Sequence, residues 1–390
     1  MNLSMTAQVV INNCKASKSE ELLISNLGID EQPDLSQFSW VERLDLSKNN
    51  LKKINKSLLP PNLKILCLNQ NKITSISHLD IPESIEILFV SVNQIKHFDG
   101  VEFQNLKKLD ISVNCLETFT FPPNVEKVNI SANTLEKIGE FPESLTKLLC
   151  HDNMLTDFSY INNKLICINI ANNKFSELPP FPDTIEYIIC EDNYISQLWY
   201  IPENVKVFNI KNNRLKNLYL ESICLPKCIE IIDFSDNMLS EMPSLPEGIK
   251  EVYFSGNRIE ELVKIPLSVK ILDVSDNCLS RIPEELKKRD MKFKYDNNLI
   301  HDDSDTDLYR STSPDDTIFG NMFDMPPKKQ EKDILDYFRG QKDNQSPPQT
   351  KEPIVTYYSG YNSHMLGTSA YNSPPKPKYI YIVHKKKVIL

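Results

Sequence analysis

The chain has 390 residues, 25% of them charged, and a formal net charge of −9 at pH 7. This acidic balance argues against nonspecific binding of nucleic acid through a basic face. No stretch of 18 apolar residues occurs, so we expect no membrane-spanning helix.

Residues 1–40 precede the first clear repeat, and we expect them to cap the N-terminal end of the stack described below. Ser17 and Glu20 fit a capping box, which predicts a short helix running through Leu22 and Leu27. A separate binding arm is the alternative. The opening sequence has neither a basic region nor a long apolar run, so we do not expect a secretory signal.

A short phrase, apolar-x-apolar-x-x-Asn-x-apolar, recurs about every 21 residues over the segment 41–302. Its two apolar positions alternate as in a half-buried strand, and one strand per repeat would stack on the next as a parallel sheet. The sequence therefore predicts a leucine-rich-repeat solenoid of about thirteen repeats, of the α/β class but mostly β, with the sheet on the concave face. The thirteen central asparagines are Asn49, Asn71, Asn93, Asn114, Asn133, Asn153, Asn173, Asn193, Asn213, Asn237, Asn257, Asn277 and Asn298.

These asparagines have a structural interpretation. An inward-pointing amide offers two donors and an acceptor to turn backbone groups that would otherwise be buried without partners. We expect stacked copies to form a ladder and not to contact a ligand.

A second position that recurs with the same spacing predicts the backbone conformation on the outer side of the stack. In nine copies a proline stands eleven residues before the asparagine: Pro60, Pro82, Pro122, Pro142, Pro182, Pro202, Pro226, Pro246 and Pro266. Proline has a fixed φ and no backbone donor, so we expect extended or 3-10 segments there and a shallow arc.

The side chains between the apolar positions should face the concave side. Lys108, Lys127 and Lys147 form a basic column over three successive repeats, and acidic residues precede several asparagines further on. Exposed apolar and aromatic residues between the two charged regions would mark a partner site, although solvated charges and lateral packing are the ordinary alternative. The candidate partner-binding residues are Phe89, Lys108, Lys127, Lys147, Leu149, Tyr187, Ile189, Glu191, Asp192 and Tyr253.

The segment 303–390 has a different composition. It is rich in proline, opens with an acidic stretch and contains no cysteine, which predicts a mostly disordered tail. Within it, KKQEKDILDYFRG offers one short amphipathic helix near 328–339.

No catalytic or metal-binding motif is present, so we expect no cofactor and no enzymatic activity. Cys150 and His151 are adjacent in a predicted strand and would point to opposite faces. Cys224 and Cys228 lack a second pair or a nearby histidine. Nine cysteines without end-cap clusters indicate free thiols in a reducing compartment such as the cytoplasm.

The phrase LPEGIKEVYFSGNRIEEL resembles the short bacterial-type leucine-rich repeat known from secreted effectors of pathogenic bacteria. The Asn-, Ile- and Lys-rich wording, with many free cysteines, is more similar to the leucine-rich-repeat proteins of amoeba-infecting giant DNA viruses. The resemblance implies the fold and protein binding. Some bacterial effectors add a ubiquitin-ligase domain with a catalytic cysteine, which the segment 303–390 lacks.

These observations predict a non-enzymatic scaffold that binds a protein partner on its concave face, in the cytoplasm of an infected host cell. One alternative is a substrate-recruiting adaptor whose tail docks a ubiquitin ligase or another enzyme complex. The other is a structural component of a virion.

Overall fold

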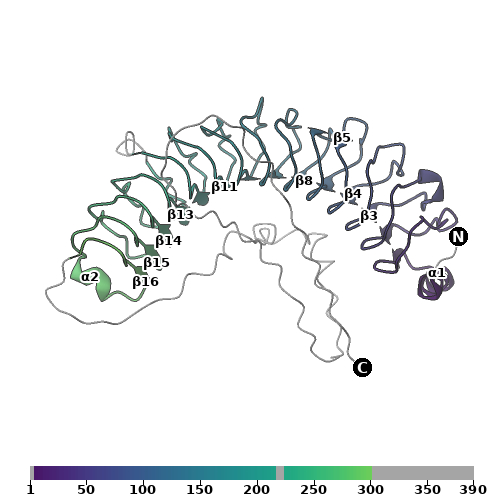
Figure 1. Cartoon of the computed structure of the whole chain (residues 1–390), viewed down its shortest axis with the longest axis horizontal. Coiled ribbons are helices and arrows are strands. Elements are labelled where there is room, and N and C mark those ends of the chain that lie inside the picture. The colour runs from purple at the N-terminus through teal and green to yellow at the C-terminus, as the bar shows by residue number, and fades with distance from the viewer. Residues whose placement is uncertain (1–3, 217–223, 301–390) are drawn as a thin grey trace, which may run out of the picture. The chain divides into compact units, whose positions relative to one another are not determined.

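The computed structural model describes residues 4–216 and 224–300, so the tail 303–390 and the helix predicted near 328–339 lie outside the described residues. Within the described part, fourteen short parallel strands form one sheet in the order β1-β2-β3-β4-β6-β8-β9-β10-β11-β12-β13-β14-β15-β16. One strand comes from each turn of the chain, and the strands lie along the inner side of the curved stack (Figure 1). The predicted solenoid fold is confirmed.

Each strand has three residues. Their bounds are β1 Glu21–Leu23, β2 Arg43–Asp45, β3 Ile65–Cys67, β4 Ile87–Phe89, β6 Lys108–Asp110, β8 Lys127–Asn129, β9 Lys147–Leu149, β10 Cys167–Asn169, β11 Tyr187–Ile189, β12 Val207–Asn209, β13 Ile231–Asp233, β14 Glu251–Tyr253, β15 Ile271–Asp273 and β16 Lys292–Lys294.

The register puts equivalent residues of successive turns side by side. Leu44 of β2 aligns with Leu66 of β3, which aligns with Leu88 of β4. All three are fully buried, so the middle residue of each strand belongs to the core. No turn could bury this residue alone, which is why the fold needs the whole stack.

Phenylalanines extend the core along the stack. Phe98, Phe119, Phe121, Phe141 and Phe158 follow one another with ring centroids 4.9 to 5.6 Å apart. These separations are typical of favourable aromatic pairs. The aromatic row therefore couples neighbouring turns on the side away from the sheet.

Each central asparagine joins its own turn to the one before it. The Nδ2 of Asn71 donates to the carbonyl oxygen of Leu68 in its own turn at 2.9 Å and to that of Leu46 in the preceding turn at 3.0 Å. Its Oδ1 accepts from the backbone N–H of Leu51 at 3.0 Å. The Oδ1 of each of the thirteen asparagines accepts from a backbone N–H of the preceding turn in the same way, so the stack contains a continuous amide ladder.

The outer side is mostly extended and has little helix, as the prolines predict. In the described residues it holds the 3-10 turn η1 (Lys56–Leu58), the short helix α2 (Glu284–Lys287) and a two-stranded parallel sheet of β5 (His97–Asp99) and β7 (Thr118–Thr120). The two strands of this sheet belong to consecutive turns.

The helix expected to begin at Ser17 is wrong. The helix α1 is Met5–Ser17, so it ends where the predicted one was to begin. Ser4 caps it, accepting from the backbone N–H of Ala7 at 3.2 Å. Glu21–Leu23 instead form β1, because Leu22 is buried as the middle residue of a strand that pairs with β2.

The sheet therefore starts one turn before the first asparagine phrase. Leu27 occupies the position that Asn49 holds in the next turn, four residues after the strand. A central asparagine bonds backbone groups of the turn before it, and α1, not a turn, precedes β1. The first turn has no such partners, so an apolar residue can replace the amide.

Candidate functional site

The first and third residues of every strand face the inner side of the sheet, and the register arranges them in columns. Lys108, Lys127 and Lys147 align directly across β6, β8 and β9. Lys108 is 7% exposed, with its Nζ 5.4 Å from the ring centroid of Phe89, a distance typical of a cation–π contact. Lys127 and Lys147 are half-buried and keep part of their surface accessible. The structure thus brings the predicted basic column together.

The apolar part of the predicted site differs from expectation. Leu149 and Ile189 are only 7% and 1% exposed, and Phe89 is 8% exposed. Strands about 4.8 Å apart place such side chains against their neighbours in the column, which covers them. The expectation that Leu149 and Ile189 are exposed is therefore wrong. Tyr187 and Tyr253 are half-buried and are the aromatic candidates that retain accessible surface.

Acidic groups gather over β11–β15. Burial raises the pKa of the Glu191, Asp233 and Asp236 carboxyls. Glu191 accepts from the Nδ2 of Asn209 at 2.7 Å, and the Nζ of Lys211 lies 3.9 Å from an oxygen of Asp236. The inner face is therefore acidic and partly desolvated over β11–β15, whereas its middle, over β6–β9, carries the basic column.

Tyr253 lies in the acidic region and is hydrogen-bonded there. Its hydroxyl donates to an Oε2 oxygen of Glu251 at 2.9 Å. Burial, followed by this bond, raises the pKa of Tyr253 well above its usual range. The phenol is therefore fixed in its neutral, hydrogen-donating form.

The acidic residues that precede the asparagines have a backbone explanation that the sequence pattern concealed. Asp152, Asp192, Asp236 and Asp276 all adopt φ between 53° and 55°. This left-handed region admits Asp, Asn and Gly more readily than other residues. Asp192 also accepts from the side-chain amide of Asn212 in the following turn. The turn therefore favours Asp at these positions without requiring it, since Val92 and Val113 adopt the same φ region in earlier turns.

We expect the substitution Asp233→Asn to raise the melting temperature at pH 7. Burial raises the pKa of Asp233, so the folded protein holds this proton more tightly than the unfolded chain. Stability from this group is then highest at low pH and falls as pH rises through the folded pKa. The equivalent Asn169 and Asn209 make the same bond to a backbone N–H two residues on, so the amide should fit.

Thermal melts across pH check this prediction. The gain should shrink as the pH falls and vanish where Asp233 is protonated in both the folded and the unfolded protein. A gain that is equal at all pH values would instead point to an effect unrelated to the carboxyl charge.

The thiols have structural explanations. Cys150 is fully buried, its Sγ lies 3.4 Å from the carbonyl oxygen of Asn169, and burial raises its pKa. Cys228 donates to the carbonyl oxygens of Glu203 and Val205, as Ser144 and Thr184 do at the equivalent positions. No group of His, Cys, Asp or Glu in the described residues could hold a metal ion.

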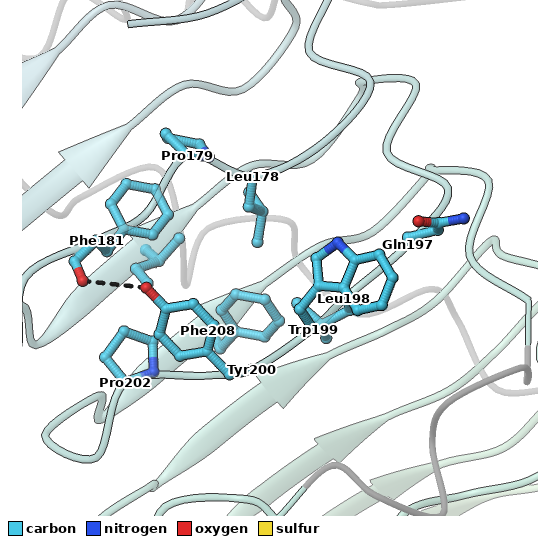
Figure 2. A pocket seen from close by; sticks show the side chains of 10 residues that line it. Leu178, Pro179, Phe181, Gln197, Leu198, Trp199, Tyr200, Pro202 and Phe208 are labelled. Atoms are coloured by element: carbon cyan, nitrogen blue, oxygen red, sulfur yellow. Dashed lines mark hydrogen bonds between the residues drawn. The ribbon is translucent and has the colours of Figure 1, made fainter. Parts of the chain in front are cut away.

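A small notch opens on the outer side between two loops, residues 178–181 and 197–202 (Figure 2). Its volume is about 20 Å³, which is room for roughly one water molecule. Small-molecule sites span about 300–1,000 Å³. The notch is therefore too small for a metabolite, although its rim carries the exposed Trp199 and Tyr200.

No family model and no curated protein matches the chain. Several solved structures are similar to the chain. YopM from Yersinia enterocolitica WA-314 is 26% identical with a TM-score of 0.51, over 73% of this chain and 71% of that one. YopM from Yersinia pestis, a leucine-rich effector protein, is 22% identical with a TM-score of 0.60, over 74% and 92%. The functional domain of InlJ from Listeria monocytogenes is 18% identical with a TM-score of 0.61, over 72% and 63%.

The chain is a leucine-rich-repeat solenoid. It resembles leucine-rich-repeat proteins of pathogenic bacteria, as the short repeats predict. Among the described residues of this solenoid, no helix is long and apolar enough to cross a membrane. The fold is one that commonly serves protein–protein binding, so the function has to be argued from its surface.

Proposed function

We propose that this solenoid is a non-enzymatic scaffold that binds a protein partner on the inner face of its sheet. The observation that carries the proposal is the aligned column of Lys108, Lys127 and Lys147 on the same face as the acidic region over β11–β15. A rigid face with opposite charge at two places selects a partner by electrostatic complementarity.

The charges define the chemistry of the partner. It would present acidic side chains to the β6–β9 region and basic or hydrogen-bonding groups to the β11–β15 region. Tyr187 is half-buried and lies in β11, at the edge of the acidic region nearest the basic column, as an aromatic anchor. Nucleic acid fits poorly, because its phosphates would meet the acidic region and a net charge of −9.

The thiols support a reducing setting. All nine cysteines are unpaired. Leucine-rich-repeat proteins of oxidising compartments usually carry disulfides. We place the protein in a cytoplasm, and the likeness of its repeats to those of bacterial effectors and giant DNA viruses makes an infected host cell the proposed setting.

The test is capture of partners from native cells with the charge of the basic column reversed. Lys127→Glu together with Lys147→Glu should reduce recovery of the specific partner by about tenfold, because both substitutions place like charges opposite its acidic groups. Lys137→Glu reverses one charge at an exposed residue outside the sheet and should leave recovery intact, and each single reversal at Lys127 or Lys147 should reduce it.

Tyr187→Ala supplies an independent arm, since it removes an anchor without changing charge. Ile189→Ala is unsuitable, because Ile189 is 1% exposed and truncation would leave a cavity in the sheet. Recovery that is unaffected by both the double reversal and Tyr187→Ala would show that the inner face is not the binding surface.

A further inference from the structure

Three consecutive turns carry exposed rings on their outer side: aromatic residues in the first and third turns and prolines in the second. The asparagines of these turns are spaced by twenty residues, so residues twenty apart in the sequence occupy equivalent positions. Tyr160, Pro180 and Tyr200 therefore form one column, and Pro179 and Trp199 lie in the adjacent column. We call these five residues the outer strip.

The strip is exposed although its residues are large. Tyr160 is 44% exposed, Tyr200 49% and Trp199 61%. The core of the same turns is filled by other side chains, among them Phe181 and Leu198, so the strip is not needed to complete it. A group of exposed aromatic and proline rings of this kind marks a binding site more often than an isolated exposed residue does.

Two tyrosines of the strip are held in place by hydrogen bonds. The Tyr200 hydroxyl donates to the carbonyl oxygen of Phe181 at 3.3 Å (Figure 2), and the Tyr160 hydroxyl lies 3.3 Å from an oxygen of Glu143. Side chains that are already oriented lose little conformational entropy when they bind. The two rings are thus prepared to receive a ligand on their faces.

Acidic residues border the strip on both sides. The column that contains Glu143, Asp183 and Glu203 lies three residues after the tyrosine column, and Asp157 and Glu177 lie three residues before it. All five are exposed, and the same two columns carry the exposed Lys137 one turn before Asp157 and the exposed Lys227 one turn after Glu203.

Other charged residues near the strip do not reverse the negative charge of its surroundings. Lys164 and Lys174 are exposed on the turns of the strip, and Glu140 is a further exposed acid at the head of the tyrosine column, one turn before Tyr160. The carboxylates of Glu143 and Glu140 raise the pKa of Tyr160, with Glu143 the larger influence. The surroundings of the strip are therefore net negative.

We propose that the outer strip is a second binding surface, which takes an extended, proline-containing segment of a partner protein flanked by Lys or Arg. Aromatic rings in a row accept proline rings, because an extended polyproline segment is already ordered and presents flat apolar surfaces. The bordering carboxylates and the ring faces both attract the flanking cations. A second copy of the chain is a poorer occupant, because its own outer strip would bring negative charges against these carboxylates.

The notch beside the strip sets the manner of binding. It has room for about one water molecule, so the segment lies across the rings and does not insert a side chain. The strip is on the outer side, whereas the proposed inner-face site lies on the sheet. Substitutions at one site should therefore leave the other intact, and either proposal can fail alone.

The test uses the full chain and three fluorescein-labelled ten-residue peptides. The first has four lysines separated by Pro-Pro pairs, the second replaces each proline with alanine, and the third replaces each lysine with glutamate. Fluorescence anisotropy should show saturable binding of the first peptide and about tenfold or weaker binding of the other two. Trp199→Ala should weaken binding of the first peptide by about tenfold or more.

Tyr194→Ala is the matched control. Tyr194 is 45% exposed, lies outside the strip and has the Arg214 guanidinium 4.4 Å from its ring centroid. Its loss should leave the affinity for the first peptide unchanged. Melting temperatures of both variants establish that each is folded, as expected for exposed positions.

Four outcomes would overturn the proposal. Equal binding of the alanine peptide would show that charge alone attracts the ligand, and equal binding of the glutamate peptide would show that the acids are irrelevant. An unchanged affinity of the folded Trp199→Ala variant would remove the strip from the site. Self-association of the wild type that is lost in Trp199→Ala, measured by sedimentation, would assign the strip to a second copy of the chain.

Discussion

Asn193→Ala is expected to lower the free energy of unfolding by about 2–4 kcal/mol, since it leaves a buried backbone donor without its acceptor and weakens several further bonds. Asn193 is 5% exposed and lies in the middle of the amide ladder. Its Oδ1 accepts from the backbone N–H of Phe175 at 3.0 Å, and its Nδ2 donates to the carbonyl oxygens of Ile170 and Cys190. Alanine supplies none of these contacts.

The substitution affects the backbone partners of Asn193 unequally. The carbonyl oxygen of Ile170 also accepts from Asn173, and that of Cys190 also accepts from Asn213, so both keep a partner. The backbone N–H of Phe175 has no such second bond among the hydrogen bonds of the described residues. The main cost therefore comes from this one donor, with lesser costs from the carbonyls.

Asn298→Ala provides the control, because Asn298 makes the same set of bonds at the last turn. Its Oδ1 accepts from the backbone N–H of Leu279 at 2.9 Å, but the asparagine is only half-buried, so water can replace it. Urea unfolding should show a clearly smaller loss for Asn298→Ala than for Asn193→Ala. Equal losses would mean that the ladder acts locally and that burial does not decide its contribution.

The repeat phrase predicted the fold because its information is periodic and local. Each apolar pair specifies a buried strand, and each asparagine specifies a turn, so thirteen copies place thirteen strands. The turn of β1 was missed because Leu27 stands where the phrase requires asparagine. Only the pairing of β1 with β2 reveals it, and that pairing is a contact between residues more than twenty positions apart.

The inner face was predicted less completely, since burial depends on neighbouring columns that a single phrase does not describe. The alignment of Lys108, Lys127 and Lys147 follows from their equal position in the phrase. The burial of Leu149 and Ile189 does not follow, because it depends on the close spacing of adjacent strands. Asp152 and Asp192 carried a charge that suggested a surface role, while their positive φ values, invisible in the sequence, favour aspartate independently of any partner.

The outer strip is only partly predictable from the sequence. The equal spacing of Asn153, Asn173, Asn193 and Asn213 was nevertheless sufficient to align Tyr160 with Tyr200. What the sequence could not supply is the exposure of these rings.

Gly100→Ala is expected to destabilise the stack by about 3 kcal/mol, an overpacking effect on a contact between consecutive turns. A Cβ atom at Gly100 would lie 2.5 Å from the backbone nitrogen of Pro122 and 2.7 Å from the carbonyl carbon of Phe121. Both distances are shorter than the closest approach of real Cβ atoms, and backbone atoms cannot rotate away as a flexible side chain could. The two turns would have to separate.

That separation would act on the outer sheet. Gly100 follows β5, and its backbone N–H donates to the Thr120 hydroxyl of β7 at 2.9 Å. Beneath the sheet, Phe98 stacks on Phe119 with ring centroids 5.6 Å apart. Loosening the turns would lengthen both contacts, so proteolysis of the variant should begin between residues 97 and 122.

Gly139→Ala tests whether the clash, and not the loss of a glycine, is responsible. Gly139 also lies on the outer side, but the nearest atom to an added Cβ is the Cα of Thr120 at 3.9 Å, an ordinary van der Waals contact. This substitution should be neutral or stabilising by about 0.5 kcal/mol, since alanine restricts the unfolded chain. Urea unfolding of the two variants gives the comparison. A Gly100→Ala protein as stable as Gly139→Ala would show that consecutive turns can move apart at this point without cost, contrary to the close packing of β5 against β7.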